Sequence, residues 1–150
     1  MNKLIAITIG DINGIGIDIL IKTWKERKIK NFILITNIII FNKILKKRKI
    51  KLTYNIVNNR KNNFIYLKDR FNIFSYKSNS LEDNTYKSLK YGYKLCTNKK
   101  CIGIITLPLR KDLIINKINK NFIGQTEFFQ KIDRKKNANM ILYHKKIIIS

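Results

Sequence analysis

LIAITIGDINGIGIDILIKTW, residues 4–24, is the stretch that decides the fold. Residues 4–9 form a continuous apolar run, which is typical of a strand buried on both faces of a sheet. Residues 10–16 are rich in glycine and predict a loop, and from residue 17 to 25 apolar side chains recur at helical spacing. A buried strand, a tight turn and a helix in this order indicate an α/β protein with a parallel sheet.

The rest of the chain continues this alternation, and we expect one domain over residues 1–150. The predicted fold class is an α/β three-layer sandwich with a largely parallel sheet. Strands are expected at 32–36 and 102–107, central in the sheet beside 4–9, and also at 52–57, 64–67 and 146–149. Helices are expected at 38–47 and 81–98, and a polar surface loop at 58–63.

The formal net charge of +23 is the most unusual feature of the composition. Such a charge attracts nucleic acids and other polyanions. The lysines are spread along the whole chain, however, and accompany many isoleucines and asparagines, with only two alanines and a single proline, Pro108. This bias is typical of an AT-rich genome, because Lys, Ile and Asn have AT-rich codons. We therefore expect only non-specific contact with nucleic acid.

The cysteines and the apolar runs favour a cytoplasmic protein. Cys96 and Cys101 are separated by four residues, and no further Cys or His stands close enough for a zinc motif. Two reduced thiols are the simpler interpretation. No signal peptide is predicted, and the most apolar run, 32–41, is too short to span a bilayer.

Three short segments are candidates for chemistry. GDINGIGID, residues 10–18, places glycines between a strand and a helix, where backbone N–H groups can bind an anion; a plain tight turn is the alternative. TLPLRK, residues 106–111, follows a predicted strand, so that Lys111 can reach a phosphate or hydroxyl at the edge of the sheet where α/β proteins bind ligands; a solvated lysine is the alternative.

The third segment is GQTEFF, residues 124–129. Gly124 permits an unusual turn, Thr126 is expected to cap the following helix, and Glu127 suits the positive first turn of that helix. A plain helix start is the alternative interpretation.

In order and spacing, these segments resemble the 4-hydroxythreonine-4-phosphate dehydrogenase family of pyridoxal phosphate (vitamin B6) biosynthesis. Residues 10–18 resemble the family's G-D-P-A-G-I-G-P-E, residues 106–111 its T-A-P-[IL]-x-K, and residues 124–129 its G-H-T-E-F-[FL]. Met140-Ile141-Leu142 stands where the family has Met-Met-Leu. The resemblance extends over the whole chain, is weakest between residues 37 and 80, and corresponds to the N-terminal half of these enzymes.

The resemblance implies a fold of the isocitrate and isopropylmalate dehydrogenase type, with two α/β domains, an active site between them and a homodimer. It implies an oxidoreductase that uses NAD to oxidise 4-phosphooxy-L-threonine, a phosphorylated hydroxy-amino acid, to a β-keto acid that decarboxylates. A divalent metal (Zn, Mg or Co) held by three histidines assists this reaction. By the same resemblance Gln125 and Thr126 are the substrate-binding pair, and Asp11, Gly14 and Lys111 line the cleft.

The sequence departs from the family in three ways. Gln125 replaces the family histidine, so this position can form hydrogen bonds but cannot carry a proton near neutral pH. Ile12 and Ile17 replace the two prolines of the first motif. The family's metal-binding histidines lie beyond residue 149, and His144 matches none of them. We therefore expect a truncated or split form without metal ligands or assigned catalytic residues, inactive alone and completed by a complementing C-terminal fragment.

A second hypothesis is a basic, non-enzymatic α/β module that binds RNA. Tyr86-Lys87-Ser88-Leu89-Lys90-Tyr91 interleaves aromatic and basic side chains, which can stack on bases and neutralise phosphates. The same spacing also suits a helix that packs its aromatic residues inward. No RNA-recognition motif accompanies the stretch.

Overall fold

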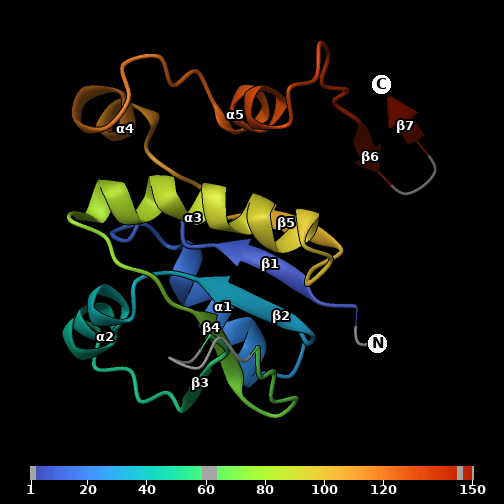
Figure 1. The fold of residues 1–150 in the computed structure, drawn as a ribbon. Helices are drawn as coiled ribbons and strands as arrows, with labels where there is room; N and C mark the ends of the chain where they lie inside the picture. Colours follow the sequence, from blue (N-terminus) through green and yellow to red (C-terminus); the bar gives the residue numbers. More distant parts are fainter. Residues whose placement is uncertain (1–2, 59–63, 145–146, 150) are drawn as a thin grey trace.

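A computed structural model describes residues 3–58, 64–144 and 147–149. The helices and strands alternate along most of the chain (Figure 1). In order they are β1 (Ile5–Thr8), α1 (Gly16–Lys25), β2 (Phe32–Ile35), α2 (Ile38–Lys47), β3 (Tyr54–Ile56), β4 (Phe71–Phe74), α3 (Leu81–Thr97), β5 (Gly103–Thr106), α4 (Lys111–Lys117), α5 (Gln125–Ile132), β6 (Leu142–His144) and β7 (Ile147–Ile149).

Five strands form one parallel sheet in the order β3-β4-β2-β1-β5. Helices α1 and α2 pack on one face, where Leu20 and Phe41 join the larger buried cluster. Helix α3 packs on the other face, where Leu95 joins a second cluster. The predicted α/β three-layer arrangement is therefore confirmed, and the carboxyl ends of β1 and β5 lie next to each other.

The core of the sheet is built around Phe71, which is fully buried. Its ring lies 5.4 Å from Trp24 and 5.2 Å from Phe32, both edge to face, and 6.0 Å from the stacked ring of Phe41. Aromatic pairs at these distances add to the stabilisation from burial. Strands and helices of the first half are thus held by one dense aromatic cluster.

Two strand predictions are wrong. The expected strand 64–67 is only an isolated bridge at Phe64, and the fourth strand is β4, at 71–74. Its apolar run is interrupted by Asn72, whose side chain is buried and bonds to backbone groups of Leu67 and Arg70. Strand β5 was expected in the centre of the sheet but forms its edge, and Ile105 is 43% exposed there.

The other elements lie close to their predicted positions, and one helix was not predicted. Helix α2 matches its prediction and α3 ends one residue earlier, whereas α4 was not expected. Residues 59–63 of the predicted loop and residue 146 of the last predicted strand lie outside the described residues.

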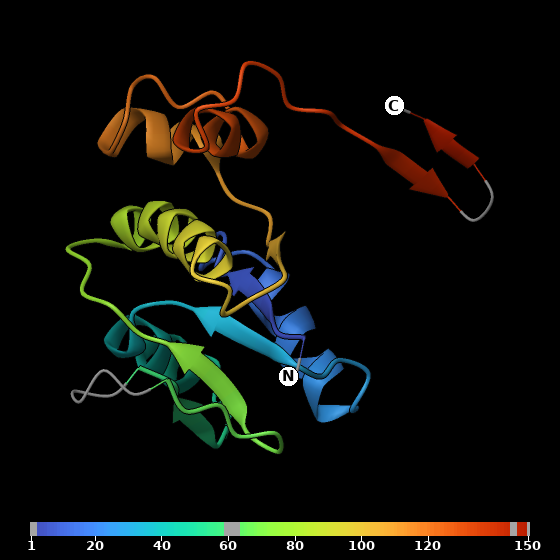
Figure 2. The same cartoon turned by 45° about the vertical axis from the view of Figure 1, so that its right-hand side comes forward.

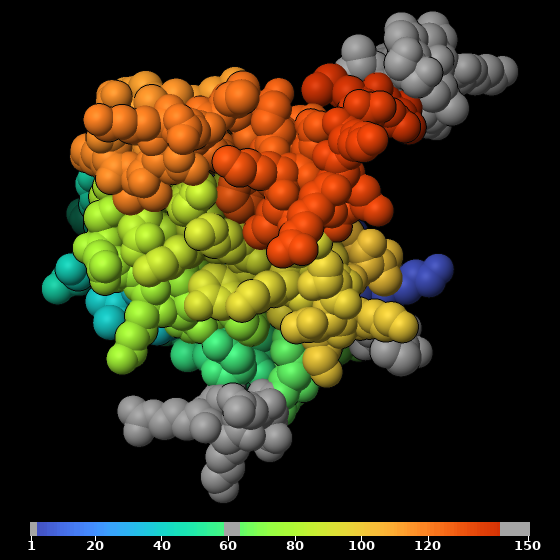
Figure 3. Space-filling model, turned by 45° about the horizontal axis from the view of Figure 1, so that its top comes forward, coloured from blue at the N-terminus to red at the C-terminus, as the bar shows by residue number. Residues whose placement is uncertain are grey.

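The C-terminal part differs from the sheet in its packing. Helices α4 and α5 lie over α3, as the orange and red surface above the yellow-green surface in Figure 3 shows. A small cluster of Leu89, Ile114 and Phe122 joins them. The antiparallel hairpin β6–β7 lies apart from the sheet in both ribbon views (Figures 1 and 2).

Candidate functional site

The first two candidate segments touch at the carboxyl ends of β1 and β5. Gly10 has a φ of 65°, in the left-handed region, and a Cβ there would lie 2.5 Å from the carbonyl oxygen of Pro108. The backbone N–H of Asp11 donates to that same oxygen at 2.7 Å. Only glycine meets both demands, so Gly10 allows the turn to pack against the 106–111 segment.

The turn after β1 is closed by its own side chains. The Oδ1 atom of Asp11 accepts a hydrogen bond from the N–H of Asn13 at 3.0 Å, and the N–H of Gly14 donates to the carbonyl of Asp11 at 3.1 Å. From the second turn of α3, the buried hydroxyl of Thr85 donates to the carbonyl of Gly10 at 2.7 Å. Asp11 and Gly14, both predicted to line the cleft, therefore lie on a fixed turn.

Arg48 also holds this turn, and the sequence analysis did not single it out. It lies just after α2, and its Nη2 donates to the carbonyl oxygens of Ile12 at 2.8 Å and Gly14 at 3.1 Å. Its Nη1 lies 2.6 Å from Oδ1 of Asp18 in α1. Nothing in the local pattern distinguishes Arg48 from the neighbouring lysines, because its role depends on a contact 34 to 36 residues away.

The third segment reaches the same edge of the sheet through Gln125. The Oε1 atom of Gln125 accepts from the hydroxyl of Thr106 at 3.2 Å, and its Nε2 donates to the carbonyl of Leu107 at 3.3 Å. Thr106 and Leu107 belong to β5 and the residue after it. All three candidate segments are thus connected by hydrogen bonds around Leu107 and Pro108.

The expected capping role of Thr126 is wrong. Helix α5 begins at Gln125 with Gly124 at the cap position, without a side-chain capping bond. Thr126 lies inside the first turn of the helix and is half-buried, and Glu127 lies in the same turn, as expected. With Gly124 in an extended conformation at the cap position, the helix starts two residues earlier than the sequence pattern predicts.

Lys111 opens α4 and lies near Gly124. A Cβ on Gly124 would lie 3.5 Å from the Nζ atom of Lys111 and 2.7 Å from Oε2 of Glu127. The ammonium group of Lys111 therefore lies close to the start of α5, with its side chain exposed. Lys111 and Gln125 approach the edge of the sheet from different helices.

One of the cavities that border the turn is small. It has a volume of about 30 Å³ and is bounded by Asp11, Thr85 and Arg110 among others. A space of this size holds a water molecule or two, not a phosphorylated amino acid. Another cavity that borders the turn has a volume of about 480 Å³ and is lined by Ile12, Asn13 and Arg48 among others.

The described residues do not form a metal centre. Among them, no three His, Cys, Asp or Glu side chains lie close enough to hold a metal ion. Burial raises the pKa of Cys101 to about 12 and also raises that of Cys96, so both thiols stay protonated at neutral pH, unlike metal-binding thiolates. The donor set in the described part of the chain does not fit the divalent metal that the resemblance implies.

Two aromatic residues of α3 are half-buried and pack against rings of other elements. Tyr91 stacks on Tyr76 at 4.5 Å, and Tyr86 packs edge-on against Phe122 and Phe128. These contacts favour the interpretation of α3 as an amphipathic helix over that of a row of rings open to nucleic-acid bases. No helix in the described part of the chain is long and apolar enough to cross a membrane.

The fold and the three connected segments define a class of protein: a parallel α/β sandwich with a polar edge at the carboxyl ends of its strands. Residues 28–150 match the family model described as pyridoxal phosphate biosynthetic protein PdxA. The chain therefore belongs to the PdxA family. A search of curated protein sequences gives no match.

Solved structures agree on the fold. An assigned 4-hydroxythreonine-4-phosphate dehydrogenase from Salmonella typhimurium superposes with a TM-score of 0.79 at 20% identity, covering 97% of this chain and 50% of that one. The structure of the same name from Klebsiella pneumoniae has a TM-score of 0.78 at 18% identity, covering 97% of this chain and 49% of that one. The structure from Burkholderia phymatum has a TM-score of 0.77 at 16% identity, covering 99% of this chain and 48% of that one. The chain thus spans about half the length of the structures that it matches.

Proposed function

We propose that these 150 residues form the N-terminal half of an NAD-dependent oxidoreductase that converts 4-phosphooxy-L-threonine to a β-keto acid, which then decarboxylates. The observation that supports the proposal most is the meeting of the three motif segments at one edge of the sheet. Asp11 bonds to Pro108, and Gln125 bonds to Thr106 and Leu107. Family membership over residues 28–150 points the same way.

In this proposal Gln125 and Thr126 contact the substrate, and Lys111 lies where it can bind a phosphate or hydroxyl oxygen. Gln125 uses one N–H and its carbonyl oxygen within the protein, which leaves its second N–H to bind substrate. An amide neither gains nor loses a proton as an acid or base near neutral pH, so a proton acceptor must come from another group. Asp11 and Gly14 shape the edge through the turn that Arg48 holds.

Metal-assisted chemistry in this proposal requires a second part, because the described residues lack a three-ligand cluster. A bound divalent ion would stabilise the negative charge that develops on the substrate oxygen. The partner is therefore a C-terminal half, joined to this chain or separate, and the whole is expected to act as a homodimer. In this proposal the C-terminal half also covers the edge of the sheet at which the three motif segments meet.

The test is complementation. This chain is co-expressed with the C-terminal half of the Salmonella typhimurium structure that it resembles, and NAD reduction is measured with 4-phosphooxy-L-threonine. We expect turnover by the pair, and none by the chain alone with zinc, magnesium or cobalt. Metal-dependent turnover by the chain alone would contradict the proposal, as would a stable, metal-loaded pair that binds NAD but not the substrate.

Two variants examine the assigned residues within the active pair. Lys111→Met is expected to lower kcat/KM about 10- to 100-fold, because a charge-assisted contact to a phosphate or hydroxyl is lost. Lys120→Met removes the same charge from an exposed position in the α4–α5 connection and serves as the matched control. Gln125→Ala is expected to raise KM. Equal effects of Lys111→Met and Lys120→Met would show that Lys111 has no specific role.

A further inference from the structure

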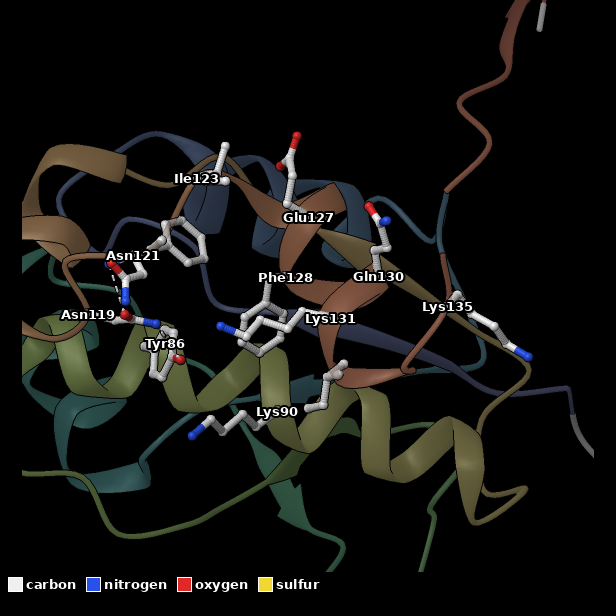
Figure 4. A pocket seen from close by; sticks show the side chains of 12 residues that line it. Tyr86, Lys90, Asn119, Asn121, Ile123, Glu127, Phe128, Gln130, Lys131 and Lys135 are labelled. Atoms are coloured by element: carbon white, nitrogen blue, oxygen red, sulfur yellow. Dashed lines mark hydrogen bonds between the residues drawn. The ribbon is translucent and has the colours of Figure 1, made fainter. Parts of the chain in front are cut away.

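A second hollow lies away from the edge at which the motif segments meet. It has a volume of about 640 Å³ and lies between α3 and the stretch from the α4–α5 connection to the end of α5 (Figure 4). None of the five residues predicted for the substrate side lines it. Cavities of this volume are of the size that holds small organic ligands.

The floor of this cavity, which we call the α3–α5 cavity, is aromatic. Tyr86 and Phe128 lie with ring centroids 5.5 Å apart, and Phe122 lies 6.1 Å from Tyr86. Ile123 adds apolar surface and is 66% exposed. Planar rings bind well on such a floor, because ring edges and faces attract each other and water is displaced from apolar surface.

The mouth of the cavity is basic. In Figure 4 the side chains of Lys90 and Lys131 extend toward the end of the cavity where Tyr86 lies, whereas that of Glu127 points away from the rings. The Nζ atom of Lys90 lies 4.9 Å from the centroid of the Tyr86 ring. Among the described residues, neither Lys90 nor Lys131 forms an ion pair with a carboxylate. Two ammonium groups are therefore available to an anion beside the aromatic floor.

The hydroxyl group of Tyr86 can also donate a hydrogen bond to a ligand in the cavity. The Nδ2 atom of Asn119 donates to the Oη of Tyr86 at 3.1 Å, so that the Tyr86 hydroxyl keeps its own hydrogen to donate. Asn119 is fixed in turn by the N–H of Asn121, which donates to its Oδ1 at 3.0 Å. The end of the cavity at Tyr86 thus combines an aromatic floor, two of the three lining lysines and one neutral donor.

We propose that the α3–α5 cavity binds a small aromatic anion, with the ring on Tyr86 and Phe128 and a phosphate or carboxylate between Lys90 and Lys131. Charge complementarity selects this occupant. The two ammonium groups at the mouth form no ion pair with a carboxylate among the described residues, so they favour an anion over a neutral or basic segment. The proposal is independent of the dehydrogenase activity, because it concerns a different set of residues.

The test separates the ring from the charge. Isothermal titration calorimetry at low salt compares phenyl phosphate, inorganic phosphate and phenol as ligands of the complete chain. We expect phenyl phosphate to bind at least about tenfold more tightly than either half-ligand, because it uses both the floor and the lysines. Equal binding of phenyl phosphate and inorganic phosphate would overturn the proposal, because it would reflect only the general positive charge. Undetectable binding of phenyl phosphate would overturn it as well.

Substitutions locate the binding. Lys90→Gln and Lys131→Gln are each expected to weaken phenyl phosphate binding about fivefold, and Lys94→Gln less than about twofold. Lys94 is an exposed lysine one turn farther along α3 that does not line the cavity, so it controls for loss of net charge. An effect of Lys94→Gln as large as that of Lys131→Gln would overturn the proposal.

Phe128→Leu removes a ring but keeps an apolar side chain, and is expected to weaken phenyl phosphate binding about threefold with an unchanged circular dichroism spectrum. Sedimentation of the same variants tests the alternative that a second copy of the chain occupies the cavity. Self-association that Phe128→Leu abolishes, together with failure of all ligands to bind, would make the cavity an interface between copies and contradict the proposal.

Two further ligands distinguish the source of the anion. Adenosine monophosphate offers a purine ring, and pyridoxine 5′-phosphate offers a pyridine ring without an aldehyde that would react with lysines. Tighter binding of one of them than of phenyl phosphate supports the proposal and assigns the ring type. Binding of both no better than inorganic phosphate would count against it.

Discussion

The sheet region, up to β5, and the C-terminal region, from α4 onward, are stabilised in different ways. In the sheet region Phe71 is fully buried between strands and two helices, with Phe32 buried and Trp24 partly buried beside it. In the C-terminal region α5 has no buried residue, and contact with α3 depends on a few side chains such as Ile114 and Phe122. The polar edge is therefore built from two parts: the well-packed sheet region and the more weakly attached C-terminal region.

The largest expected effect concerns the two aromatic clusters. Phe71→Ala is expected to lower the free energy of unfolding by about 3–5 kcal/mol, because it leaves a cavity in a fully packed site. Phe128→Ala, at a half-buried position on α5, is expected to cost about 1–2 kcal/mol. Denaturant unfolding followed by circular dichroism gives both values.

Hydrogen exchange tests whether the sheet region and the C-terminal region unfold separately. Phe128→Ala should speed exchange in α4 and α5 while leaving β1 and β2 protected, since the sheet has its own core. Equal losses of protection in both regions after Phe128→Ala would show that they unfold as one unit and would contradict the contrast drawn above.

A smaller effect is expected where the rigid region meets the site. Gly10→Ala places a side chain at a φ of 65° and 2.5 Å from the Pro108 oxygen, and is expected to cost about 1–3 kcal/mol. Gly14→Ala is the matched control, because a Cβ there would meet its nearest neighbour, the Asp11 oxygen, at 3.3 Å. Its cost is expected to stay below about 1 kcal/mol. Similar unfolding free energies for the two variants would contradict this account of the turn.

The smallest effect concerns an ion pair between the regions. The Nζ of Lys117 in α4 lies 2.7 Å from Oε1 of Glu82 in α3, and this hydrogen bond lowers the pKa of Glu82. Because the folded-state pKa is lowered, the stabilisation is present above the ordinary pKa of Glu82, 4.5, and is lost as the pH falls through the lowered value.

Lys117→Gln is therefore expected to reduce stability by about 0.5 kcal/mol or less at pH 7, since Lys117 is largely exposed, and to have no effect at the acid end. Chemical denaturation of this variant and of Lys120→Gln across the pH range measures the difference. A pH-independent deficit of Lys117→Gln would rule out the ion pair as its cause.

Several features were predictable because they depend on neighbours in sequence. The apolar run at 4–9 has to be buried, so β1 lies inside the sheet, and α2 follows its apolar spacing from Ile38 to Lys47. Strand β4 escaped prediction because Asn72 interrupts its apolar pattern, and its buried amide is satisfied only in the folded chain, by backbone groups of Leu67 and Arg70 and by the side chain of Asn55. The position of β5 at the edge depends on strand order, which no local pattern contains.

The alternation of strands and helices, the family resemblance and the three motif segments can be read from the sequence, because each is a property of residue order and side-chain chemistry. The meeting of these segments, the contact of Arg48 with the turn at Gly14, and the position of Gly124 rather than Thr126 at the cap of α5 depend on the folded chain. Folding also creates the α3–α5 cavity, whose walls come from helices far apart in the chain. The physical reason is that hydrogen bonds and apolar contacts form between groups that folding brings together, whatever their separation in sequence.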